Sequence, residues 1–283
     1  LNSLDVSSFD TSSVTDMKYA FSFLSNLSNL DLTNFSTTNV TNMSYMFYNS
    51  TGLTNLVLSS FNTSSVTNMS YMFRSVSGIT GLDLSHFDTS NVTDMSQMFR
   101  GASALTGLNV SSFNTSIVTD MSWMFTSTSS LTSMDLTNFD TSRVTNMAGM
   151  FYGASAITSL DISSFDTAGV TDMTFMFSLL NGLSGLDISN FDTSNVTVMT
   201  KMFYHATGLN TLNLSTFDTS NVTVMSDMFN GTANLTSLNT TNWNISNVSD
   251  SVGIFTATNT SLIVSCDQGG SSGTGTLFGE TCH

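Results

Sequence analysis

The stretch FDTSNVTDMSQMF, residues 87–99, decides the fold because it returns with small changes throughout the chain. Residues 113–125 read FNTSIVTDMSWMF, and residues 191–203 read FDTSNVTVMTKMF. The Phe that closes the stretch recurs every 26 residues, at Phe21, Phe47, Phe73, Phe99, Phe125, Phe151, Phe177, Phe203, Phe229 and Phe255. A fixed period of this length indicates a repeat architecture, in which each unit packs only against its neighbours.

Ten copies run over residues 1–260 without an insertion or deletion, and we number the positions of each copy 1 to 26. In the copy at residues 79–104, apolar residues occupy positions 1, 4, 6, 9, 14, 17, 20 and 21. Positions 4 and 6 alternate with polar neighbours, which predicts a short half-buried strand. Positions 14, 17, 20 and 21 fit one face of a helix, and Thr with Asp or Asn at positions 15 and 16 fits its start.

We therefore expect an α/β solenoid of ten coils over residues 1–260, each with a short parallel strand and a short helix. A capping tail over residues 261–283 would follow. Stacked coils bury their apolar edges in one continuous core, and parallel strands about 4.7–4.9 Å apart give a rod on the order of 50 Å long. Methionine recurs at positions 17 and 20, where a stacked ladder in the core explains the row better than a metal or peptide site.

The consensus LDLSxFDTSxVTDMSxMF resembles the BspA-like leucine-rich repeat of bacterial and protist surface proteins, including its mycoplasma-lipoprotein variety. The resemblance covers all ten copies. It implies an α/β leucine-rich-repeat solenoid, an extracellular or cell-surface location and a role in adhesion. Because the ligands of such proteins are often unknown, the resemblance implies no particular ligand.

Composition and charge narrow the classes of partner. Only 9% of the residues are charged, yet the net charge is −15 at pH 7, and the basic residues are scattered, at Lys18, Arg74, Arg100, Arg143 and Lys201. Nucleic acid and anionic membrane surfaces are poor partners for such a chain. The sequence contains no run of 18 apolar residues, so it predicts no membrane span. The chain begins with Leu in phase with the repeat, so we expect a mature fragment of a longer precursor.

Asn-X-Ser/Thr sequons fall at positions of the coil that we expect to be exposed. One set precedes the predicted helix, at position 13, and comprises Asn39, Asn91, Asn195, Asn221 and Asn247. A second set lies in the loop after it and comprises Asn26, Asn49, Asn230, Asn234 and Asn259. A bulky glycan fits such turns, so we expect N-glycosylation at these ten asparagines. Glycans would also solvate a surface that carries few charges.

The residues of catalysis are sparse, and we expect no enzyme. His86, His205 and His283 are too few and too scattered for a catalytic centre, and no nucleophile elbow or phosphate loop is present. Aspartate recurs at positions 5 and 10, where each carboxylate is expected to cap a turn through backbone N–H groups. Calcium between stacked carboxylates is the less favoured alternative, and no other cofactor is expected.

Cys266 and Cys282 are the only cysteines, and both lie in the tail. In an extracellular protein such a pair predicts one disulfide that closes a loop over the last coil. Free or metal-bound thiols are the alternative. The Gly-rich segment DQGGSSGTG at residues 267–275 is expected to be a flexible loop.

These patterns favour a non-enzymatic, secreted or cell-surface glycoprotein with a structural or adhesive role. The first repeat shows no cap, because Leu1, Leu4, Val6 and Phe9 are those of an ordinary internal repeat. Head-to-tail association through this assembly edge would build a glycan-coated fibril. One alternative is a leucine-rich-repeat ectodomain that recognises a protein or carbohydrate on its strand face. Ice binding by the Thr rows at positions 11 and 15 is a third hypothesis.

Overall fold

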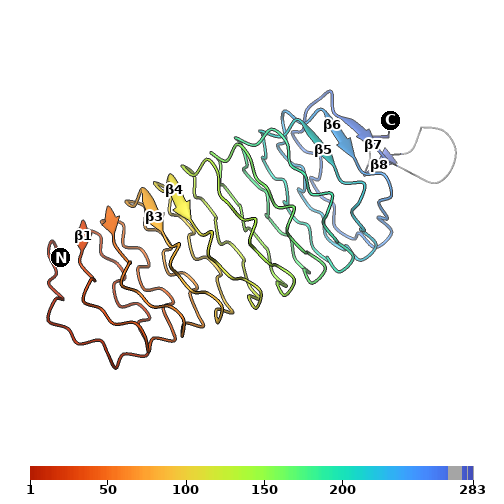
Figure 1. Ribbon diagram of the computed structural model, residues 1–283. Helices are drawn as coiled ribbons and strands as arrows, with labels where there is room; N and C mark the ends of the chain where they lie inside the picture. The colour runs from red at the N-terminus through yellow and green to blue at the C-terminus, as the bar shows by residue number, and fades with distance from the viewer. Residues whose placement is uncertain (267–275, 279, 283) are drawn as a thin grey trace.

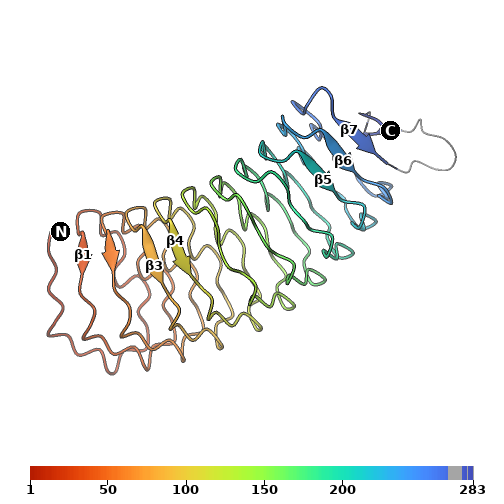
Figure 2. The same cartoon turned by 45° about the horizontal axis from the view of Figure 1, so that its top comes forward.

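The computed structural model describes residues 1–266, 276–278 and 280–282, and these form one elongated solenoid (Figure 1). Successive coils stack along one axis, and the two termini lie at opposite ends of the rod. The short strands follow one long side of the rod in both views (Figure 2). Paired strands are offset by 26 residues, so each sequence repeat forms one coil.

Strands form where the alternating pattern predicts them, at positions 3 to 5 of the coil. They are β1 (Asn29–Leu30), β2 (Asn55–Leu56), β3 (Gly81–Asp83), β4 (Gly107–Asn109), β5 (Thr211–Asn213), β6 (Ser237–Asn239) and β7 (Ile263–Ser265). All pairs among them are parallel, in the orders β1-β2, β3-β4 and β5-β6-β7. The side chain at position 4 faces the core, as Leu82 and Leu212 show.

The predicted helix at positions 14 to 21 is wrong, because the described residues contain no helix. Position 16 instead pairs with the same position of the adjacent coils, in a second parallel ladder that runs from Asp16 to Asp250. Backbone N–H groups at positions 17, 19, 21 and 23 donate to carbonyl groups of the next coil, as from Met17 to Asn42 (2.9 Å). A helix would use these N–H groups within its own segment, so bonding between coils replaces it.

Positions 19 and 23 keep this segment from becoming helical. All ten residues at position 19 and all ten at position 23 have a positive φ, such as Tyr45 (59°), Gln97 (57°) and Ser127 (55°). Only five of them are glycines, which are Gly101, Gly149, Gly153, Gly231 and Gly253. A left-handed backbone costs a residue with a side chain about 1–2 kcal/mol. The hydrogen bonds between coils offset this cost by satisfying the backbone of every turn.

The core lies where the apolar positions predict it. Phe side chains at position 21 stack from Phe21 to Phe255 with ring centroids 5.5–5.9 Å apart. The Met columns are buried beside them, with Met95 and Met98 fully enclosed. The Thr column at position 11 is buried as well, and each hydroxyl donates to a carbonyl of the next coil, as from Thr89 to Asn114 (2.9 Å). This row is therefore enclosed and cannot contact ice, whereas the Thr row at position 15 is exposed.

The C-terminal end of the rod is covered. β7 belongs to the predicted tail, yet it pairs with β6 in the register of an eleventh coil, and Val264 is buried at position 4. Cys282 pairs beside Val264 and forms a disulfide with Cys266. The short strands β8 (Thr276–Leu277) and β9 (Glu280–Thr281) pair antiparallel. The rest of the tail, including the Gly-rich segment at 267–275, lies outside the described residues.

Candidate functional site

The position-13 asparagines form a ladder on the surface of the rod. All five are exposed. Each side-chain amide donates to the position-12 carbonyl of the preceding coil, as from Asn91 to Ser64 (2.8 Å) and from Asn221 to Ser194 (2.7 Å). An amide has two N–H groups, so one of them is used between coils and the other is left for solvent or for a glycan.

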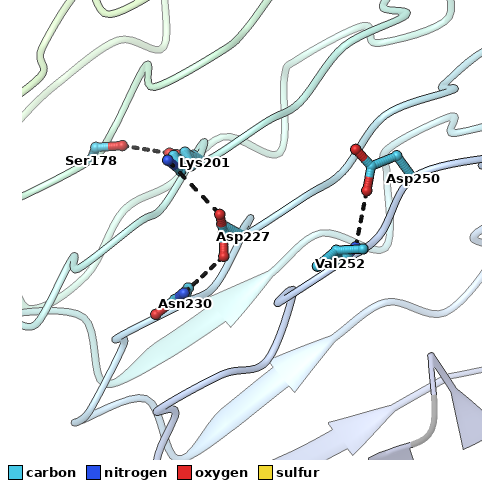
Figure 3. Close-up of polar contacts among 6 residues, drawn as sticks. All are labelled: Ser178, Lys201, Asp227, Asn230, Asp250 and Val252. Atoms are coloured by element: carbon cyan, nitrogen blue, oxygen red, sulfur yellow. Dashed lines mark hydrogen bonds and ion pairs between the residues drawn. The ribbon is translucent and has the colours of Figure 1, made fainter.

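The second set of sequon asparagines is less uniform. Asn26 and Asn234 are exposed, whereas Asn49, Asn230 and Asn259 are half-buried. Asn234 donates to the carbonyl of the preceding coil at 2.7 Å, in the manner of the position-13 ladder. The amide of Asn230 donates to Asp227 at 2.8 Å (Figure 3). The surface of the coil therefore favours the position-13 asparagines over this set as sites for a bulky group.

The aspartates at positions 5 and 10 cap turns, as the sequence predicts. Asp5 accepts from both the backbone N–H and the hydroxyl of Ser7, and Asp192 accepts from the N–H of Ser194 at 2.9 Å. Hydrogen bonds from the serine hydroxyls and N–H groups lower the pKa of both carboxyl groups. Among the described residues, no three His, Cys, Asp or Glu side chains gather into a potential metal site. The two Asp columns thus serve the turns that follow them.

The strand face holds a shallow hollow of about 580 Å³ between β2 and β4. Gly81 and Gly107 open it, because a Cβ added to either glycine would meet no atom within 4 Å. Asp83, Asn109 and the exposed ring of His86 line its rim. Two smaller hollows of the strand face also have polar linings, which include Asp31 and Thr33 in one and Asp161 and Asp187 in the other.

A second surface, which we call the turn strip, consists of the side chains at positions 18, 19 and 22. All six tyrosines of the chain lie there, as do Trp123, Phe175 and four of the five basic residues. The expectation that the basic residues are scattered is therefore wrong, since only Arg143 lies elsewhere. The signal is present in the sequence, because every Tyr occupies position 19 or 22 once the coil is numbered.

Aromatic rings stack along the turn strip. The rings of Tyr45 and Tyr71 are parallel with centroids 4.2 Å apart, and Tyr19 stacks on Tyr45 at 4.5 Å. Burial and the neighbouring tyrosines raise the pKa of Tyr45. Trp123 lies across the backbone of the next coil, where Gly149 leaves room for its ring. The strip is thus an ordered surface rather than a set of independent side chains.

The C-terminal part of the turn strip is more polar and carries its own counter-charge. Figure 3 shows Lys201 facing Asp227, with Nζ and Oδ2 separated by 3.8 Å. The Ser178 hydroxyl donates to the Lys201 carbonyl, and the N–H of Val252 donates to Asp250 at 3.1 Å. Lys201–Asp227 is the ion pair that the described residues contain.

The predicted assembly edge is exposed only in part. Leu1 and Phe9 are 67% and 57% exposed, Leu4 is half-buried and Val6 is buried. The other predicted site, the disulfide, is present, with Cα atoms of Cys266 and Cys282 5.4 Å apart. The described residues include no helix long and apolar enough to cross a bilayer.

Comparison with known proteins places this repeat in a family. A family model described as a Mycoplasma protein of unknown function, DUF285, matches residues 1–81, 73–184 and 181–263. The chain belongs to the DUF285 family. Its three overlapping matches together span residues 1–263, which include all ten coils, and each match covers several of the 26-residue repeats.

No curated protein matches this DUF285 chain. Among solved structures, the functional domain of InlJ from Listeria monocytogenes, which includes a cysteine ladder, is similar at 19% identity with a TM-score of 0.23. That likeness covers 84% of this chain and 45% of the InlJ chain. The chain thus spans less than half the length of that structure.

Proposed function

We propose that this chain is a non-enzymatic structural or adhesive repeat protein that acts outside the cell or at its surface. The observation that carries the proposal is the periodic outer surface, on which most coils present similar polar groups at the same positions. The family match supports a repeat protein of this type, and the BspA-like motif gives the expectation of a surface location. The aspartate carboxylates accept hydrogen bonds from the backbone of their own turns, which supports a structural role for them.

We propose that the position-13 asparagines carry N-linked glycans in the native protein. They are exposed, and their amides keep one N–H free of the ladder between coils. Peptide mapping of native material is expected to find Asn91, Asn195 and Asn221 modified. Thr93→Ala removes the sequon at Asn91, and its loss of one glycan mass is the expected result.

Thr119→Ala is the matched control for that experiment. Thr119 occupies the same position 15 as Thr93 and makes the same type of hydroxyl bond to the preceding coil, but Ile117 stands where the sequon asparagine would be. Its intact mass is expected to change only by the substitution. Unmodified Asn91, Asn195 and Asn221 in native protein would refute glycosylation of this column.

We propose further that the exposed edge of the first coil joins to the capped end of another molecule, which gives a fibril. Apolar side chains at 67% and 57% exposure, Leu1 and Phe9, need a cover in water. Further coils of the same polypeptide would cover this edge equally well. Electron microscopy separates the two, because fibrils have no fixed length whereas a longer single solenoid does. Phe9→Asp is expected to shorten fibrils, and fibrils of unchanged length would contradict the contact.

A second candidate is a ligand-binding protein that uses the strand face, and the hollow at Gly81 and Gly107 favours it. Gly107→Tyr would fill the hollow without displacing the backbone, since the glycine Cβ position is open. If the hollow binds a glycan, wild-type protein binds a glycan array and this variant does not. Equal binding by both would exclude the hollow.

A further inference from the structure

The turn strip concentrates positive charge on a strongly acidic chain. The net charge is −15, and Lys18, Arg74, Arg100 and Lys201 all lie on this one surface. The aspartates of positions 5 and 10 lie on other parts of the coil and bond to their own turns, whereas Asp227 lies on the strip and pairs with Lys201. A local positive field on a protein of opposite net charge is a feature that an anionic partner can recognise.

Arg74 and Arg100 form the centre of this surface. Both donate through Nη1 to the same side-chain oxygen of Gln97, at 2.9 and 3.1 Å. The amide nitrogen of Gln97 in turn donates to the hydroxyl of Tyr71. Gln97 therefore fixes the two guanidinium groups side by side, and each still has N–H donors to offer.

Among the described residues, no carboxylate forms an ion pair with Arg74 or Arg100. The ion pair of the described residues joins Lys201 to Asp227, four coils and more away along the chain. Burial, and next the charge of Arg74, lower the pKa of Arg100. The two guanidinium groups repel each other and share only the neutral oxygen of Gln97. An oxyanion that accepts hydrogen bonds from both would bind them more strongly than that oxygen does.

Aromatic faces hold the two guanidinium groups in place. Arg74 lies over the rings of Tyr48 and Tyr71, at 5.5 and 5.3 Å from their centroids, and Arg100 lies over Trp123 at 5.1 Å. These contacts order the charged groups before any partner arrives, which lowers the entropy cost of binding. The ring edges beside them extend the same surface along neighbouring coils.

We propose that the turn strip binds an acidic polysaccharide, with a carboxylate or sulfate group held between Arg74 and Arg100 and sugar rings against the Tyr48, Tyr71 and Trp123 side chains. The inference goes beyond the proposed function and holds whether or not the chain forms fibrils. A linear polymer fits because the cations recur along the rod, in coils 1, 3, 4 and 8. An acidic peptide would gain affinity mainly from side chains anchored in pockets, and the hollows described above lie on the strand face instead.

Four variants of the full chain test this assignment. Arg74→Gln, Arg100→Gln and the double variant remove the charges while keeping long polar side chains. Arg143→Gln is the matched control, because it removes the same charge from an exposed residue outside the turn strip. Each variant is first checked for an unchanged thermal melt, since all three arginines lie at the surface or half-buried.

Binding is measured by isothermal titration at low and at physiological salt. The probes are polygalacturonate, dextran sulfate, neutral dextran and poly-glutamate. The expected result is binding of polygalacturonate or dextran sulfate, weakened roughly tenfold by Arg100→Gln, as for the loss of one charged hydrogen bond, and unchanged by Arg143→Gln. Whichever of the two acidic polymers binds identifies carboxylate or sulfate as the group recognised.

Four results would overturn the proposal. They are no binding of either acidic polymer, equal binding of neutral dextran, equal weakening by Arg143→Gln, and poly-glutamate binding as tightly as the polysaccharides. Sedimentation velocity provides a fifth result that would overturn it. Self-association of the wild type that the double variant abolishes would assign the strip to a second copy of this chain instead.

Discussion

Two residues in every coil adopt a left-handed backbone, and most of them carry a side chain. At position 19 the strained residues include Tyr45, Gln97 and Trp123, whose side chains stack or hydrogen-bond on the turn strip. At position 23 glycine appears in three coils, and Ser127 lies between two of these, with no hydrogen bond from its hydroxyl among the contacts described. The two columns therefore differ in what compensates the strain.

Ser127→Gly is expected to stabilise the protein. Its φ of 55° is unfavourable for a residue with a Cβ, and the neighbouring Gly101 and Gly153 show that the column accepts glycine. Relief of this strain should raise the free energy of unfolding by roughly 1 kcal/mol. The greater conformational entropy of glycine in the unfolded chain reduces this gain. Thermal denaturation measures it. Tyr45→Gly relieves similar strain but removes ring stacking, so it should lower the melting temperature, and a rise there would disprove the compensation.

Phe151→Ala is expected to be severely destabilising. Phe151 is fully buried, and its ring stacks between Phe125 and Phe177 with both centroids 5.9 Å away. Truncation opens a cavity between three coils and should cost about 3–5 kcal/mol. Chemical denaturation gives the value. A loss below 1 kcal/mol would mean that the stack relaxes to fill the space.

At the scale of the coil, each short turn is closed by a side-chain oxygen that accepts the backbone N–H of the residue two positions later. Position 10 illustrates the rule, because Asp88 and Asn114 accept the N–H of Ser90 and Ser116 in the same way. An amide oxygen therefore replaces a carboxylate without loss of the turn. Unlike the amide, the carboxylate carries a negative charge and can be protonated at low pH.

Acid is expected to destabilise the solenoid through these loops. Hydrogen bonds lower the folded-state pKa of Asp88, Asp140, Asp192 and Asp218 below the ordinary 3.8. Between the folded pKa and 3.8 the unfolded chain binds more protons, so stability is full above about pH 4 and is lost as the pH falls further. Melting temperatures from pH 7 to pH 2 measure this loss.

A variant with asparagine at these four positions is the control. It keeps the acceptor for each serine N–H, so its melting temperature should fall less below pH 4 than that of the wild type. Repulsion between stacked carboxylates acts in the opposite direction, and it raises the pKa of Asp218 only as the smallest contribution. A wild-type melting temperature that rises on acidification would show that repulsion dominates.

Much of the coil was predictable from the sequence. The period, the strand at positions 3 to 5, the enclosed Phe and Met columns and the Asp turns all follow from apolar spacing and side-chain chemistry. The apolar spacing does not distinguish a helix from turns at positions 14 to 21. Intervals of three, three and one residues fit one face of a helix and a series of tight turns equally well. Glycine would have signalled the turns, but only Gly149 and Gly253 occupy position 19.

The turn strip was hidden for a related reason. Tyr, Trp, Arg and Lys at positions 18 to 22 lie close in sequence to core Met and Phe, so no polar or apolar run marks them. Their meeting depends on stacking of equivalent positions 26 residues apart, as in Tyr45 on Tyr71. The sequence does not predict the eleventh-coil strand β7, because Cys266 and a Gly-rich segment follow directly after it.

At the scale of the whole molecule, the two ends differ. The last coils are closed by β7, by Trp243, whose indole N–H donates to Leu214 at 2.9 Å, and by the disulfide. The first coil leaves Leu1 and Phe9 exposed. In a stack whose coils contact mainly their neighbours, stability is approximately a sum over interfaces, so unfolding begins at the weaker end.

Reduction of the disulfide, or replacement of both cysteines by serine, is expected to loosen only the C-terminal end. A loop closed over 16 residues contributes roughly 3 kcal/mol in the chain-entropy view. Hydrogen exchange should speed up in β7 and its partner β6 and stay unchanged in β3 and β4. Faster exchange along the whole rod would show that the coils unfold as one cooperative unit.

The hydrogen bonds between coils also determine how the rod responds to force. Pulling on the two termini loads each interface in series, so a terminal coil detaches while the others keep their bonds. A freed coil of 26 residues extends to roughly 90 Å, whereas the stacked phenylalanines of adjacent coils have ring centroids only 5.5–5.9 Å apart. Under load, such a rod would therefore lengthen in steps, one coil at a time.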